Sequence, residues 1–138
     1  MATLAIAGLL GGCGGGSEGE PTDATVGVGA QSGPPSTADV NAVAECLHKP
    51  FGLIGNYGSD TTFGQPHVVL AVQTGKTTTE GYRVEVFSSP EAAQSALPAA
   101  KDYFANTNGP VEVSGSSIVA PSSSTFDPSA LPKIKACL

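Results

Sequence analysis

Two neighbouring stretches in the middle of the chain have the hydrophobic pattern of β-strands. Residues 67–73 are almost all apolar and rich in β-branched side chains, which is typical of a central strand covered on both faces. In residues 82–87 apolar side chains alternate with Arg83 and Glu85, which predicts one apolar and one polar face. A polar, turn-rich connection over residues 74–81 joins the two stretches, so we predict an antiparallel hairpin. Cross-strand pairing accounts for both charged side chains.

Three other segments repeat apolar side chains every three or four residues, which predicts amphipathic helices. The first begins at Ser36 or Thr37, whose hydroxyl groups suit a helix cap, and ends at Pro50. The second begins at Pro90, behind a serine cap. The last follows an Asp-Pro pair and becomes regular near Leu131.

The remaining segments are shorter and less regular. Residues 51–54 fit a short strand, and residues 55–60 carry the Gly, Asn, Ser and Asp of a turn. Two further apolar runs, 111–113 and 118–120, flank a Ser-Gly-Ser-Ser stretch. They predict either a second hairpin or one kinked strand.

This order of elements predicts an α+β fold. We expect a two-layer domain over residues 37–138, in which helices cover one face of a mainly antiparallel sheet of three to five strands. Residues 13–36 are rich in Gly, Ser and Pro and have no helical or strand period, so we predict a flexible linker there. The chain of 138 residues leaves enough for one domain with a modest core.

The N-terminus has the layout of an export signal. An apolar run over residues 4–10 precedes two glycines and Cys13, and a loose Gly- and Ser-rich stretch follows. The stretch Leu10-Gly11-Gly12-Cys13 resembles the lipobox of bacterial lipoproteins. That resemblance implies cleavage between Gly12 and Cys13, which removes residues 1–12 as a signal peptide, and a diacylglyceryl group on Cys13. The apolar run is too short for a transmembrane helix, which needs about 20 residues.

The resemblance also implies a location. Two or more acyl chains anchor a protein stably, so we expect the chain at the outer face of the bacterial cytoplasmic membrane, with the membrane as its partner through Cys13. The folded region is similar to small lipoproteins of actinobacteria in which cysteine-bearing helices bracket the domain. No Lys or Arg precedes the apolar run, which a start codon further upstream would explain. The alternative is an unmodified thiol at Cys13.

The chain has three cysteines. With Cys13 lipidated, Cys46 and Cys137 remain, an even number in an exported protein, where disulfides persist. We predict a bond between them that closes a loop of about 90 residues and contributes roughly 4–5 kcal/mol in the chain-entropy model. The alternative is two buried free thiols.

The net charge and the missing sequence motifs limit the classes of function that we expect. The net charge is −6, with only six Lys and Arg residues, so we expect no nucleic-acid partner. The sequence contains no Cys-x-x-Cys, His-x-x-x-His or Gly-x-Ser-x-Gly pattern. We therefore expect no metal, no cofactor and no catalytic residues.

Two function classes remain. The first is a noncatalytic module that binds an envelope protein, an envelope polymer or a small ligand in an apolar groove walled by Phe51, Tyr57 and Phe63, with His67 nearby. The second is a small enzyme in which His67, expected to be exposed or half-buried, faces a carboxylate such as Asp60 in a cleft. The lack of a catalytic constellation favours the first. Aromatic side chains on a Gly-rich stretch of this kind more often fold back over the core.

Overall fold

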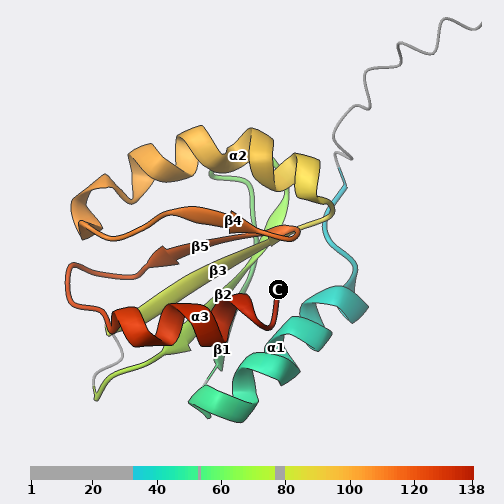
Figure 1. Cartoon of the computed structure of the whole chain (residues 1–138). Coiled ribbons are helices and arrows are strands. Elements are labelled where there is room, and N and C mark those ends of the chain that lie inside the picture. The colour runs from blue at the N-terminus through green and yellow to red at the C-terminus, as the bar shows by residue number, and fades with distance from the viewer. Residues whose placement is uncertain (1–32, 53, 77–79) are drawn as a thin grey trace, which may run out of the picture.

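The computed structural model describes residues 33–52, 54–76 and 80–138 and is shown in Figure 1. In these residues five antiparallel strands form one sheet, in the order β1-β2-β3-β5-β4. The strands are β1 (Ile54–Asp60), β2 (His67–Gln73), β3 (Gly81–Phe87), β4 (Glu112–Ser114) and β5 (Ser117–Pro121). The helices are α1 (Thr37–Phe51), α2 (Pro90–Tyr103) and α3 (Leu131–Lys135), with short 3₁₀ turns at Ala105–Thr107 and Pro128–Ala130.

Two hairpins build most of the sheet. β2 pairs with β3 from His67 opposite Phe87 to Gln73 opposite Gly81, which confirms the first predicted hairpin. β4 pairs with β5 across a turn that contains Gly115, so the second hairpin is present as well. The apolar alternation specifies the register, because a slip of one residue would turn the buried side chains to solvent. β5 pairs with β3 and joins the two hairpins.

The predicted helix starts are also confirmed. The Ser36 side chain accepts a hydrogen bond from the Asp39 amide at the start of α1. Ser89 accepts one from the Ala92 amide at the start of α2. These bonds satisfy amides that no helix carbonyl can reach. α3 becomes regular at Leu131, as expected.

The expectation for residues 51–60 was wrong. α1 continues one residue past Pro50 and ends at Phe51, and Gly52 follows as its cap with a φ of 74°, which suits glycine. Most of this stretch, expected as a turn, belongs to β1 and pairs with β2. The apolar β2 offers a partner ladder that overrides the local turn preference. A β-bulge between Asn56 and Gly58 absorbs the irregularity.

The antiparallel α+β fold is confirmed, but helices cover both faces of the sheet rather than one (Figure 1). α1 and α3 pack on the face of β3 that carries Tyr82, Val84 and Val86. α2 packs on the opposite face, against Phe87 and the β5 residue Ile118. The polar face expected for β3 therefore lies under α2, and the sheet is the middle of three layers.

Cys46 and Cys137 form the disulfide that the cysteine count predicted, with their Cα atoms 5.6 Å apart. The bond joins α1 to the residues after α3, so the first and last helices are neighbours (Figure 1). The cleavage site, Cys13 and residues 13–32 of the predicted linker lie outside the described residues. None of the helices in the described ranges is long and apolar enough to cross a membrane.

Candidate functional site

α2 covers only part of its face of the sheet. It packs on β3, β4 and β5, and the sheet is hollowed beside it, over β1 and β2. The hollow has a volume of about 520 Å³. Its lining residues are Tyr57, Ser59, Asp60, Val69, Ala71, Arg83, Ser122 and Ser123.

The hollow runs along the strands. Asp60 pairs with His67 at one end of β2. Near the other end, the Ser122 amide donates a hydrogen bond to the carbonyl of Gly81, which pairs with Gln73. β2 has seven residues, so its two ends lie roughly 20 Å apart. The shape therefore suits an elongated ligand.

Tyr57 gives the hollow an aromatic surface. It is the extra residue of the β1 bulge, and its ring lies over Gly55. A Cβ atom at Gly55 would sit 3.5 Å from the Tyr57 ring and 3.7 Å from the Cβ of Ala71, at ordinary contact distances, so the ring lies along the sheet surface at this point. Tyr57 is nevertheless 74% exposed, and its ring is available to a ligand.

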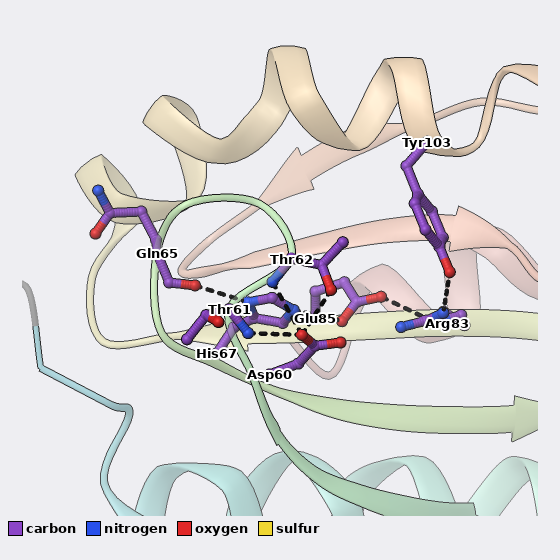
Figure 2. A network of polar contacts seen from close by, with 8 residues as sticks. All are labelled: Asp60, Thr61, Thr62, Gln65, His67, Arg83, Glu85 and Tyr103. Carbon is purple, nitrogen blue, oxygen red and sulfur yellow. Dashed lines mark hydrogen bonds and ion pairs between the residues drawn. The ribbon is translucent and has the colours of Figure 1, made fainter.

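A buried chain of polar contacts lies beside the hollow (Figure 2). His67 Nδ1 lies 2.8 Å from the carbonyl oxygen of Gln65, and His67 Nε2 lies 3.3 Å from Glu85 Oε2. Glu85 Oε1 lies 2.9 Å from Arg83 Nε. The side chains of His67 and Glu85 are fully buried. The Glu85 carboxylate is thus held between an imidazole and a guanidinium group.

The surroundings of His67 favour its protonated form. Both ring nitrogens face acceptors, and only the doubly protonated ring can donate to both. Burial favours the neutral ring, but the contacts with Glu85, the Gln65 carbonyl and Asp60 outweigh it, so the pKa of His67 is raised above its ordinary value. Phe63 stacks on the ring at a centroid distance of 5.0 Å. The fold therefore favours a positively charged ring at a buried position.

Arg83 connects this buried chain to the hollow. Its side chain is 24% exposed and lines the hollow. Nη1 donates to the Tyr103 hydroxyl at 3.5 Å, and the guanidinium lies over the rings of Tyr103 and Phe104. Glu85 and the two rings together hold the guanidinium in one orientation. Figure 2 shows its contacts with Glu85 and Tyr103.

A carboxylate stands at one end of the hollow. Oδ1 of Asp60 accepts hydrogen bonds from the amides of Thr61 and Thr62 and from the Thr62 hydroxyl. These bonds, the hydroxyl first, lower the pKa of Asp60. Oδ2 has no hydrogen-bond partner in the described ranges, so it can accept one from a ligand.

The groove predicted from Phe51, Tyr57 and Phe63 does not form. Phe51 packs on the α1 side of the sheet, Phe63 is buried near the end of α2, and only Tyr57 lines the hollow. Two of the three aromatic side chains thus fold back over the core, the alternative interpretation. His67 is fully buried, where an exposed or half-buried position was expected, because Phe63 and Phe87 cover its ring.

Sequence reasoning also paired His67 with the wrong carboxylate and missed Glu85 and Arg83 as site residues. The ion pair to His67 comes from Glu85 rather than Asp60. Register explains this contact, because His67 pairs with Phe87 and therefore lies diagonal to Glu85 on the same face. One signal for this arrangement was present in the sequence. The alanine-rich face of α2 has to pack closely on a sheet face, and β3 supplies that face.

Metal-ligating residues and known proteins give no indication of the function. Within residues 33–52, 54–76 and 80–138, no group of three His, Cys, Asp or Glu side chains could hold a metal ion. Comparison with protein-family models, with curated proteins and with solved structures found no match to the chain. A proposal of function therefore rests on the hollow and on the buried contacts beside it.

Proposed function

We propose that the folded part of this protein is a noncatalytic binding module. The observation that carries this role is the hollow beside α2, in which Tyr57, Arg83 and Asp60 present an aromatic face, guanidinium donors and a carboxylate. Ligand sites typically combine apolar surface with a few fixed polar groups of this kind. The partner is a polymer, protein or small ligand of the cell envelope.

The module is held at the outer face of the bacterial cytoplasmic membrane by lipid on Cys13. The support for this anchor is the stretch Leu10-Gly11-Gly12-Cys13, which has the residue types of a lipobox. The disulfide between α1 and the chain end agrees with a compartment outside the reducing cytosol.

The buried position of His67 supports binding over catalysis. A general base needs a ring nitrogen within reach of its substrate. Both nitrogens of His67 are engaged, one by the Gln65 carbonyl and the other by Glu85, and the side chain has no exposed surface. His67 instead supports Glu85, which in turn holds Arg83.

The intact mass of the membrane-extracted protein tests the anchor. We expect a mass that lacks residues 1–12 and includes a diacylglyceryl group, with no alkylatable thiol until the disulfide is reduced. A Cys13→Ala variant should remain unprocessed and carry no lipid. An unprocessed wild-type chain with three alkylatable thiols would contradict both the anchor and the compartment.

Sedimentation with purified, lipid-free cell-wall polymer tests the binding role, using the full chain with Cys13→Ser. The polymer should retain this protein, and Tyr57→Ala should weaken retention by roughly fivefold to tenfold, because an aromatic contact is lost. His48→Ala changes an exposed residue of α1, on the opposite side of the sheet, and should leave retention unchanged. Equal losses in the two variants would argue against the hollow as the site.

A further inference from the structure

The free donors of Arg83 indicate what the hollow binds. A guanidinium group has five N–H donors. Nε faces Glu85 in an ion pair, with 2.9 Å between Nε and Oε1, and the Tyr103 hydroxyl accepts a hydrogen bond from Nη1. The other three have no acceptor among the residues that the structure describes, although Arg83 lines the hollow. A carboxylate of a ligand matches such a pair of free N–H groups in shape and charge.

The charged groups around Arg83 balance one another. With His67 protonated, the buried chain of contacts holds two cations and one carboxylate, that of Glu85. Asp60 supplies a second carboxylate, but it stands opposite His67 in the sheet, and its charge acts on His67. Two cations and two carboxylates leave no net charge, so it is the free N–H donors of Arg83, rather than an unpaired charge, that favour an anionic group in the hollow.

The other lining groups suit a sugar. The exposed face of Tyr57 offers a flat apolar surface to the C–H side of a sugar ring. The hydroxyl groups of Ser59 and Ser122 can each donate and accept hydrogen bonds, and Asp60 Oδ2 can accept them. Alternating donors and acceptors around an aromatic face complement the hydroxyl groups of a saccharide.

A peptide strand fits the same place less well. Strand addition needs a regular row of amide and carbonyl groups along a sheet edge. β1 is an edge strand, but the bulge between Asn56 and Gly58 interrupts its row beside Tyr57. A saccharide uses side chains rather than this row, so the bulge does not hinder it.

We propose that the hollow binds an acidic oligosaccharide, with a sugar carboxylate on the free donors of Arg83 and a neighbouring sugar ring against Tyr57. This inference rests on the proposed binding function and names its ligand class. The hollow follows β2 for roughly 20 Å, so several linked sugar rings lie along it.

Amide chemical shifts of the full chain with Cys13→Ser test the proposal, with tetragalacturonate as the probe. The largest changes should fall on Ala71, Arg83 and Ser122. The fully methyl-esterified tetrasaccharide has the same length and no charge, and it should bind at least about tenfold more weakly. Arg83→Lys keeps the charge but loses the paired donors, so it should weaken tetragalacturonate about tenfold and leave the ester unchanged.

Matched variants and probes separate the outcomes. Lys133→Gln removes a cation from α3, on the opposite face, and should not alter either affinity. Tyr57→Ala changes an exposed side chain and should weaken both probes, which keeps the test valid if Arg83→Lys unfolds. Equal affinity for acid and ester, or tighter binding of acetylated tetraglutamate, would overturn the acidic saccharide and leave the binding function standing. Loss of wall-polymer retention in His48→Ala but not in Tyr57→Ala would overturn both.

Discussion

The two faces of the sheet are packed in different ways. Large apolar side chains and a disulfide close the face under α1 and α3. Its fully buried members include Leu47, Leu70, Tyr82 and Ile134. On the face under α2 the helix presents small side chains, the larger apolar ones are fewer (Phe63, Phe87, Phe104 and Ile118), and charged groups are enclosed. The helix contributes Ala92, Ala93, Ala96 and Ala100, and the sheet contributes His67 and Glu85.

This difference assigns stability and binding to opposite faces. Burying one large apolar side chain contributes about 1.5–3 kcal/mol, and the methyl group of an alanine contributes much less. The alanine face lets α2 lie close to the sheet, while the strands beside it stay open. The open part presents Tyr57 and Arg83. Because more of the large buried apolar side chains and the disulfide lie on the α1 side, we expect that side to supply the larger share of the stability and the α2 side to supply the site.

The disulfide of the α1 side should have the largest effect on stability. Cys46 and Cys137 are 91 residues apart in sequence, so replacing both with Ala should lower the free energy of unfolding by roughly 4–5 kcal/mol in the chain-entropy model. Urea unfolding of the full chain with Cys13→Ser measures the loss. The folded fraction should bind tetragalacturonate as before, because the bond lies on the face opposite the hollow. A change in its affinity would show that the two faces are not separate.

Removing the buried carboxylate of the α2 side should have the next largest effect. Glu85→Gln leaves His67 and Arg83 without their shared anion, and loss of one partner from a buried ion pair costs roughly 3–5 kcal/mol. Glu112→Gln removes the same charge from an exposed pair with Lys135 and should cost less than about 1 kcal/mol. Urea unfolding compares the two variants. Equal losses of stability in the two variants would mean that burial does not strengthen the ion pairs of Glu85.

Enlarging an alanine of α2 should have a smaller effect. Ala96 is fully buried against the sheet, so Ala96→Leu overfills the contact and should destabilise the fold by about 1–3 kcal/mol. Ala99→Leu adds the same volume on the exposed side of the helix and should stay within about 0.5 kcal/mol of wild type. Thermal unfolding of both variants tests the close approach of α2. A neutral Ala96→Leu would mean that the helix can move away from the sheet.

Local patterns were enough to predict much of this architecture. The apolar run of β2 and the alternation in β3 indicated the central hairpin, and Ser36 and Ser89 marked the helix starts. Each of these signals comes from residues that are close in sequence. The disulfide could be predicted from a count, because only Cys46 and Cys137 remained once Cys13 was set aside.

The features that were not predicted correctly depend on contacts between segments that are distant in sequence. β1 has the composition of a turn and becomes a strand because β2 lies beside it. Alternation in β3 shows that its two faces differ, but it does not reveal that a helix covers the polar one. The His67–Glu85 contact follows from the β2–β3 register, and the position of Arg83 also needs the end of α2. The candidate site was therefore less predictable than the fold.

The smallest predicted effect is a pH dependence of stability, and it distinguishes the two faces of the sheet. His67 has a raised pKa in the fold: burial opposes the charge, but Glu85, the Gln65 carbonyl and Asp60 prevail. The folded chain therefore keeps a proton that the unfolded chain releases. The resulting stabilisation is fully present below the ordinary histidine pKa of about 6.5 and is lost as the pH rises through the folded pKa. Urea unfolding at intervals from about pH 5.5 to 8.5 should show this decline.

Two variants decide whether His67 causes the decline. His67→Gln cannot titrate, so its stability should not fall over this range, and its cost should stay below that of Glu85→Gln because Glu85 still pairs with Arg83. His48→Gln removes the other histidine, which is exposed on α1, and should keep the decline. Hydrogen bonds from Thr62 lower the pKa of Asp60, and burial raises the pKa of Tyr82, so both groups titrate outside this pH range. A decline that survives in His67→Gln and disappears in His48→Gln would place the proton on the α1 side, and the assignment of charge and binding to the α2 side would then be wrong.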